Sequence, residues 1–317
     1  MFKIDTAFVE GYKNNIYIKA QQKEVRLFGR SRNEVQGSKL DFYEILDSVD
    51  AIEVTTRHGD TPIMNPEHTR RGCVLTDAEY GAMIDKLDRV RLLINPEDAY
   101  VMQAVSALSR KKDDIFIAAA LGNARTGVDG DVLVPLPEAQ KLVAVNEDGT
   151  TGHGPLNTYT LTNVSEKFNS SEIDPDIEKN WAISPKQIRN LLNDPQVTNA
   201  DFATVKVLVS GKVDMFMGFN FIMTNRLPVS AAATKYDAID GQVNAATGAK
   251  TLPAGARRNF AWVTDGMISA VGKNNFGLSV DVGQRRDKRM STQIHVVHSV
   301  GALRLEDVKV IEILVAE

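Results

Sequence analysis

Apolar residues recur with helical spacing over one long segment, residues 95–123, and predict a single continuous α-helix there. The apolar stripe of this helix consists of Val101, Val105, Leu108, Ile115 and Ala119. Asn95 is a good N-cap, Pro96 suits the first helical position, and Gly122 offers a left-handed stop. At about 1.5 Å per residue the helix would be roughly 39 Å long, well beyond the average globular helix. Such a length indicates an element around which the rest of the chain is built.

The middle of the predicted helix is charged, and its C-terminal end is apolar on every side. Within the charged run, residues 110–114 (RKKDD), Arg110 and Asp114 can pair at i, i+4. We interpret this run as a solvated helix face rather than a binding site. Because residues 115–121 are apolar all round, we expect other parts of the fold to cover them.

Residues 1–34 carry isolated apolar side chains between basic ones. The apolar residues are too sparse to close a core locally, so we expect an arm that lies across something else. A frayed terminus is the alternative.

Two segments with strand patterns, Ala51–Arg57 and Arg70–Leu75, flank a turn-rich stretch and predict a β-hairpin. Ile63 and Met64 near its tip have no apolar partner within the hairpin. A two-stranded hairpin is marginal alone, so we expect this one to rest on a neighbouring molecule; local disorder of the tip is the alternative. The following residues, 77–94, fit either a helix that begins with a Thr76 and Glu79 capping box or a returning strand.

After the long helix, the pattern predicts further helices and strands. Asn163 with Glu166 is expected to cap a short helix, and Ser184 with Gln187 forms a capping box around Pro185. A third helix is predicted over 200–209. The predicted strands are Val132–Leu136, Trp181–Ile183, Val213–Met217, Phe219–Thr224, Phe260–Val263, Gln293–Val297 and Val308–Val315. The last is apolar nearly throughout and should be central in a sheet. Residues 229–256 are rich in Ala, Gly and Thr and predict an exposed insertion.

Composition is that of an ordinary globular protein, with 43% hydrophobic and 25% charged residues. A net charge of -4 provides no global basic field that would draw the chain onto nucleic acid. Cys73 is the only cysteine, so no intrachain disulfide can form and a reducing compartment fits. No apolar run reaches the length of a membrane span and no signal-peptide pattern is present, so we expect a soluble protein made in the cytoplasm, with no membrane partner.

Residues that could carry chemistry do not form a catalytic pattern. His295 and His298 lie on one predicted strand but point to opposite faces, so we interpret them as ordinary strand histidines. His58, Asp60 and His68 share a turn-rich segment without a positioned nucleophile, which favours a contact loop over a hydrolytic site. Cys73 is expected to be a small buried residue. We therefore predict no catalytic residue, no cofactor and no metal.

Seven short runs in a fixed order carry a resemblance to a known family: RHGDTP (57–62), RRGCVLTDAE (70–79), IDKLDRVRLL (84–93), SALSRKKDDIFIAAALG (106–122), WAISPKQIRNLL (181–192), GFNFIMTNRLP (218–228) and VGALRLEDVKVIEI (300–313). Together they resemble the major capsid proteins of tailed bacteriophages, which share the HK97-like fold. The resemblance covers most of the chain.

This resemblance implies an α+β fold with five parts. They are an N-terminal arm (1–34), an extended β-hairpin loop with flanking strands (35–94), the spine helix of a peripheral domain (95–124), an axial α/β domain (125–282) with an insertion near 229–256, and strands that return to the peripheral sheet beside the spine (283–317).

The resemblance also implies a non-enzymatic structural protein of the virion that self-assembles into an icosahedral head shell and encloses double-stranded DNA without sequence-specific binding. Its expected partners are further copies in hexamers and pentamers, a scaffolding protein, a portal and, as an optional addition, a decoration protein, with assembly in the host cytoplasm. An encapsulin-like compartment shell is the alternative, and an α/β enzyme of unknown type is a more distant one. Contacts between subunits are expected at Arg57, His58, Asp60, Ile63, Met64, Arg70 and Arg71.

Overall fold

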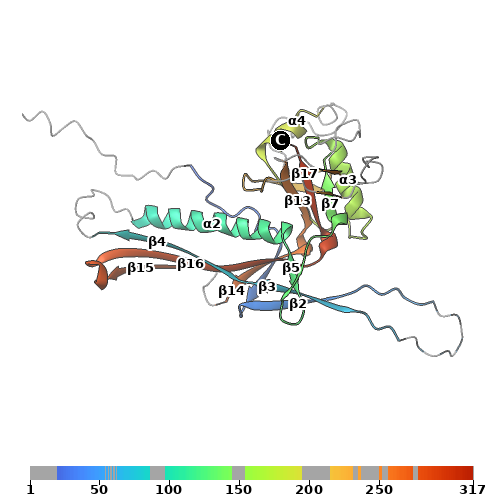
Figure 1. Ribbon diagram of the computed structural model, residues 1–317, viewed down its shortest axis with the longest axis horizontal. Helices are drawn as coiled ribbons and strands as arrows, with labels where there is room; N and C mark the ends of the chain where they lie inside the picture. Colours follow the sequence, from blue (N-terminus) through green and yellow to red (C-terminus); the bar gives the residue numbers. More distant parts are fainter. Residues whose placement is uncertain are drawn as a thin grey trace, which may run out of the picture.

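The molecule is elongated and has three visible parts (Figure 1). The long helix α2 lies along a narrow sheet, and an α/β body stands at the C-terminal end of this helix. The described residues between 47 and 67 extend away from both as a limb. The computed structural model describes residues 20–53, 55, 57, 59, 61, 63–85, 97–144, 154–194, 215–230, 235–236, 250–251, 256–273 and 278–316.

Helix α2 spans Glu97–Leu121, so the predicted long helix is confirmed. Its 25 residues correspond to about 37 Å at 1.5 Å per residue. The helix ends at Gly122, whose N–H donates to the carbonyl of Ala118 at 2.9 Å. The predicted left-handed conformation at Gly122 is wrong: the glycine is needed because a Cβ there would lie 2.4 Å from the Ala118 oxygen. Asn95 and Pro96 lie outside the described residues.

A five-stranded sheet runs beneath α2 (Figure 1). Its strands are β1 (Arg32–Gln36), β14 (Met267–Gly272), β16 (Ser291–Arg304), β15 (Ser279–Arg285) and β4 (Thr76–Ile84). The 14-residue strand β16 pairs with β14, β15 and β4 along its length, all antiparallel, and β1 joins β14 in parallel. Residues 76–84 are therefore a strand, so of the two alternatives for this segment the returning strand is correct over these residues. Ala104 and Leu108 of α2 pack on Ile294 and Val296 of β16.

The body contains a six-stranded mixed sheet. In spatial order its strands are β7 (Lys141–Val143), β17 (Val310–Val315), β13 (Arg257–Val263), β8 (Lys179–Ile183), β10 (Phe219–Met223) and β9 (Met215–Phe216). Helices α3 (Thr158–Asn169) and α4 (Pro185–Leu192) cover one face. The last strand of the chain, β17, lies inside this sheet as predicted, and not in the sheet beneath the spine helix, to which the resemblance assigns it; its Val310 still packs against the C-terminal end of α2.

Alternation along the strands of the body sheet fills two separate cores. Trp181 and Ile183 of β8 point into a core with Phe168 of α3, whereas Ala182 between them faces the other core. In that second core Phe116, near the C-terminal end of α2, packs its ring 5.4 Å from Trp262 and 6.2 Å from Phe260. A sheet buried on both faces must be apolar at successive positions, which explains the unbroken apolar runs in the sequence.

A four-stranded sheet at the base of the limb consists of β2 (Leu40–Leu46), β3 (His68–Val74), β5 (Ala124–Thr126) and β6 (Val132–Val134). The hairpin prediction is confirmed in outline, but the strand predicted at Ala51–Arg57 is wrong. Its described residues form no strand, and β2 pairs with β3 instead, from Leu40 opposite Val74 to Leu46 opposite His68.

Where the four-stranded sheet meets the five-stranded sheet, the two backbones approach closely. A Cβ at Gly301 of β16 would lie 2.7 Å from the carbonyl oxygen of Val74, so glycine is required at this crossing. The buried thiol of Cys73 lies at the same place, as expected for a small buried residue. Burial raises the pKa of this thiol to about 12, so it stays protonated.

The remaining elements are short. They are the pair β11 (Lys235–Tyr236) and β12 (Lys250–Thr251) and the 3₁₀ helices η1 (Glu138–Gln140), η2 (Thr264–Gly266), η3 (Arg286–Lys288) and η4 (Asp307–Lys309). The capping box at Ser184 is confirmed. The predicted cap at Asn163 is wrong, because α3 begins one turn and a half earlier, where Asn157 accepts from the Thr160 N–H at 2.9 Å. The helix predicted at 200–209 lies outside the described residues.

Candidate assembly interface

The limb, residues 47–67, leaves the body without a strand partner along its described residues (Figure 1). At its base the Asp47 N–H donates to the Glu67 carbonyl at 3.1 Å, beyond the last pair of β2 and β3. Farther out, Ile52 is 60% exposed and Ile63 is 88% exposed. Large apolar side chains on a segment without a core of its own indicate a surface that another molecule covers.

The structure places the predicted contact residues in two groups. Arg57 and Ile63 are exposed on the limb, and Met64 is half-buried there. His58 and Asp60 lie outside the described residues. Arg70 and Arg71 lie on β3 at the base of the limb, where both have partners in their own chain.

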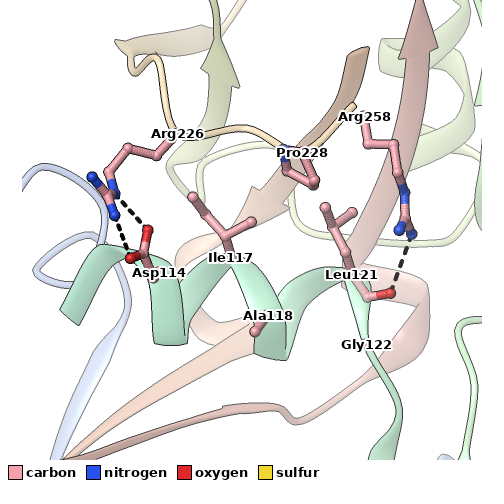
Figure 2. Close-up of a pocket in the computed structure, with 8 residues that line it drawn as sticks. All are labelled: Asp114, Ile117, Ala118, Leu121, Gly122, Arg226, Pro228 and Arg258. Carbon is pink, nitrogen blue, oxygen red and sulfur yellow. Dashed lines mark hydrogen bonds and ion pairs between the residues drawn. The ribbon is translucent and has the colours of Figure 1, made fainter. Parts of the chain in front are cut away.

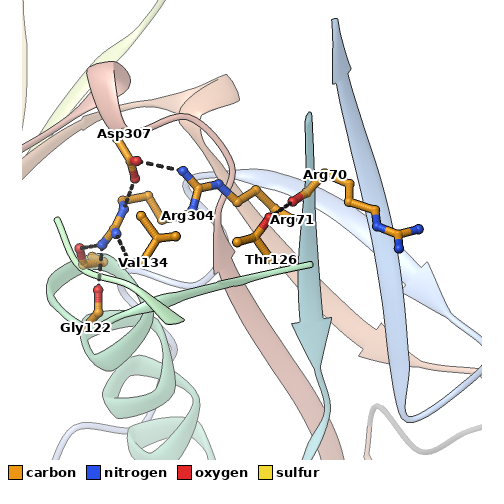
Figure 3. A network of polar contacts seen from close by, with 8 residues as sticks. Arg70, Arg71, Gly122, Thr126, Val134, Arg304 and Asp307 are labelled. Atoms are coloured by element: carbon orange, nitrogen blue, oxygen red, sulfur yellow. Dashed lines mark hydrogen bonds and ion pairs between the residues drawn. The ribbon is translucent and has the colours of Figure 1, made fainter. Parts of the chain in front are cut away.

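Arg70 and Arg71 point to opposite sides of β3 (Figure 3). The Nε of Arg70 donates to the carbonyl of Gly127 at 2.9 Å, and its guanidinium lies 4.7 Å from the ring centroid of Phe42. The Nη2 of Arg71 lies 2.7 Å from Oδ2 of Asp307 in a largely buried ion pair. Both arginines thus hold the base of the limb against the rest of the subunit.

Asp307 is shared between two arginines and connects three parts of the molecule (Figure 3). Its second oxygen, Oδ1, accepts from Nε of the fully buried Arg304 at 2.6 Å. Arg304 also donates to the carbonyls of Ala120 and Gly122 at 3.1 and 2.7 Å and so caps the C-terminal end of α2. We call Arg71, Arg304 and Asp307 the joint, since they tie β3, α2 and the strand β16 together.

Sequence reasoning missed the joint. An arginine three residues before an aspartate is a common surface pair, and the run that contains both was noted only for its family resemblance. The one available signal is that Arg304 directly follows Val300–Leu303, a run without polar side chains, where a charged side chain needs strong partners.

A second unpredicted feature is the strap, residues 20–31, which crosses α2. The buried carboxylate of Asp113 accepts from the backbone N–H groups of Arg26, Leu27 and Phe28, with the Leu27 bond at 3.0 Å, and from Nε2 of Gln22 at 2.6 Å. One carboxylate therefore satisfies three successive backbone donors of a segment that has no helix or strand of its own.

The strap also joins α2 to the body. Its Arg30 carbonyl accepts from Nε1 of Trp262 at 2.8 Å, and Leu27 and Phe28 are buried in the second core. This corrects one expectation: the charged run at 110–114 contacts the strap and is not a solvated face. The described part of the predicted arm, from residue 20 to the end of the strap, lies across α2 of its own subunit.

Asp114 does not form the predicted pair with Arg110. It makes a bidentate ion pair with Arg226, while Arg110 donates to Oε1 of Gln21 in the strap at 2.7 Å. Figure 2 shows Arg226 at one end of a pocket of about 280 Å³ on α2 and Arg258 at the other, with Ile117 and Leu121 between them. The pocket offers an apolar floor between two arginines, each neutralised by a carboxylate.

Over the residues that the structure describes, no group of three metal-ligating side chains comes together, and no helix is long and apolar enough to span a membrane. His295 and His298 lie on opposite faces of β16, as predicted.

Solved structures of phage capsids share this architecture. A capsid chain of the cyanophage P-SCSP1u superposes with a TM-score of 0.70 at 13% identity, covering 98% of this chain and 94% of that one. A capsid chain of Ralstonia phage GP4 gives 0.69 at 10% identity, over 100% and 98% of the two chains. That of Helicobacter pylori bacteriophage KHP30 gives 0.67 at 11% identity, over 99% and 97%. The predicted HK97-like capsid fold is confirmed.

The fold and the unpartnered limb define the class of shell-forming proteins. The phage capsid protein family matches residues 4–317, and the chain belongs to that family. It is a major capsid protein that forms the shell of a phage head, a structural component of the virion. An encapsulin-like compartment is not favoured, because the family that matches is that of phage capsid proteins. The curated proteins contain no match to this sequence.

Proposed function

We propose that the subunit closes hexamers and pentamers into an icosahedral head through its limb, which lies over the adjacent subunit. The observation that carries this proposal is the exposure of Ile63 and Ile52 on a segment without a strand partner. Apolar surface of this kind is unfavourable in water and stabilising when a second molecule covers it. The residues before the strap are proposed to act as the arm, in place of the whole of 1–34.

The joint gives the limb a fixed direction. Arg71 holds the strand that leads out of the limb, and Asp307 connects it to the end of α2. A limb held in one direction loses less orientational freedom on docking than a freely moving one, so several modest contacts suffice to close a shell.

The remaining partners follow from the proposed role. A scaffolding protein guides closure, a portal occupies one vertex, and a decoration protein is an optional addition outside. The shell encloses double-stranded DNA without reading its sequence, and the acidic net charge of -4 limits adhesion of DNA to the wall. Assembly takes place in the host cytoplasm, and the subunit itself has no catalytic role.

The test substitutes Ile63 with serine and expresses the subunit together with its assembly partners. Shell yield, measured by sedimentation and negative-stain microscopy, should fall at least tenfold while the subunit remains folded. The matched control is Thr61→Ala, which shortens an exposed polar side chain on the same limb. Normal shells from the Ile63→Ser subunit would contradict the proposal.

Arg57 provides a separate test of the charged contacts. It is exposed on the limb, whereas Arg70 and Arg71 have partners in their own chain, so only Arg57 reports on a neighbour without disturbing the base of the limb. Arg57→Ala should weaken shells against urea or heat, and Arg70→Ala should act mainly on the subunit.

A further inference from the structure

His298 occupies an unusual position in the strand that runs under α2. It lies two residues beyond Val296, on the face of β16 that α2 covers, and opposite Ala78 of β4. Its side chain is fully buried, and neither ring nitrogen has a hydrogen-bonding partner among the described residues. A neutral imidazole carries one donor and one acceptor, and both are costly to bury without partners.

The charges around His298 come from the two elements packed against it. Lys112 of α2 acts to disfavour a second positive charge, and Asp77 of β4 acts weakly in its favour. Lys112 is itself half-buried, and burial lowers its pKa. His295, on the same strand, faces the opposite side, is partly exposed and lies 3.2 Å from the carboxylate of Glu79.

We propose that His298 is an acid-sensitive contact between α2 and the sheet: neutral, it allows the helix to pack on β16, and on taking up a proton it forces the two apart. An imidazolium at this point would be a buried charge without a counter-ion in contact, beside a lysine. The inference goes beyond shell formation, since it predicts a pH below which α2 no longer stays packed on the sheet.

The direction of the pH effect follows from burial. Burial first, and Lys112 second, lower the pKa of His298 from 6.5 to about 4. The unfolded chain therefore binds a proton at a pH where the folded subunit does not. His298 does not change the free energy of unfolding above about pH 6.5 and lowers it as the pH drops from there towards about 4. In this range the unfolding equilibrium constant rises by at most about tenfold per pH unit.

The experiment compares the wild-type subunit with His298→Gln and His298→Leu in urea unfolding at several pH values from 7.5 to about 4.5. Between these limits the wild-type unfolding constant should rise about 100-fold more than that of either variant. Hydrogen exchange should place the acid-induced opening in α2 around Ala104 and Leu108. His295→Gln, a change at the partly exposed histidine of the same strand, should behave like the wild type.

Equal pH dependence in the wild type and both His298 variants would overturn the proposal. If neither variant folds, an NMR titration of the wild-type ring decides: a pKa near 6.5 refutes the proposal and one near 4 supports it. These measurements use the unassembled subunit, so they stand or fall separately from the proposed role of the limb in shell closure.

Discussion

The body sheet and the limb use apolar residues in opposite ways. In the body every residue of β8 and β17 is buried. Successive side chains along these strands point alternately into the two cores on either face of the sheet. On the limb, Ile52 and Ile63 are exposed and no strand pairs with the described residues. The body buries its apolar residues within one chain, whereas the apolar residues of the limb are exposed, so under the proposed function stability and assembly depend on different parts of the sequence.

The strap and the joint lie between these extremes. Both connect parts of the subunit through a carboxylate, the buried Asp113 in one case and the partly buried Asp307 in the other. Substitutions should therefore show a graded series, in which stability losses fall from the body through the two carboxylate contacts to the limb.

The largest loss of unfolding free energy is expected for Phe116→Ala, which removes the ring that packs against Phe260 and Trp262 and leaves a cavity there. Truncation of a buried aromatic residue costs about 4 kcal/mol in free energy of unfolding. Urea denaturation followed by circular dichroism measures it. A loss below about 1 kcal/mol would mean that the body does not depend on α2, contrary to the packing described above.

Arg304→Met should come next, at about 3 kcal/mol, because it uncovers the carbonyls at the end of α2 and removes one of the two partners of Asp307. The matched control is Lys309→Met, which removes a partly exposed ion pair with Glu306 close by. The control should lose less than about 1 kcal/mol. Similar losses of unfolding free energy in both variants would show that the joint contributes no more than a partly exposed ion pair does.

Asp113→Asn should cost about 1–2 kcal/mol, since an amide group replaces one of the two oxygens that accept from the strap. The diagnostic readout is limited trypsin digestion, in which cleavage after Lys23 and Arg26 should speed up before the body is attacked. Lys111→Gln, an exposed change in the same charged run, should leave the rates of cleavage after Lys23 and Arg26 unchanged.

The smallest effect is expected for Ile63→Ser, which should alter the free energy of unfolding by less than about 0.5 kcal/mol because the side chain is already exposed. The comparison between body and limb requires this near-zero change together with the loss of shells described above. A destabilised subunit would show that the limb contributes to its own fold.

Local signals in the sequence were sufficient for some elements and not for others. The long helix and the capping box at Ser184 were predictable because their determinants lie within a few residues of each other. The first strand of the hairpin was misplaced because Ala51–Arg57 has the alternation of a strand, whereas pairing with β3 selects Leu40–Leu46. Alternation predicts a strand only where a partner is within reach.

The candidate interface was predicted in part. Ile63 could be found from the sequence because a large apolar residue in a turn-rich stretch has no nearby apolar residues to pack against. The roles of Asp113 and Asp307 could not, since Leu27 and Arg71 lie 86 and 236 residues away from them. In addition, the donors to Asp113 are mainly backbone N–H groups, which carry no sequence signal. The same applies to the two histidines of β16, which look alike in the sequence and differ completely in burial.

The position of β16 and β17 has a consequence for biosynthesis. These two strands come last among the strands, yet one lies in the interior of the narrow sheet and the other in the interior of the body sheet. A nascent chain still on the ribosome cannot complete either sheet until Ser291–Val315 has emerged. Strands that come earlier in the sequence therefore have open edges until β16 and β17 are available, so neither sheet closes before both of these strands have been made.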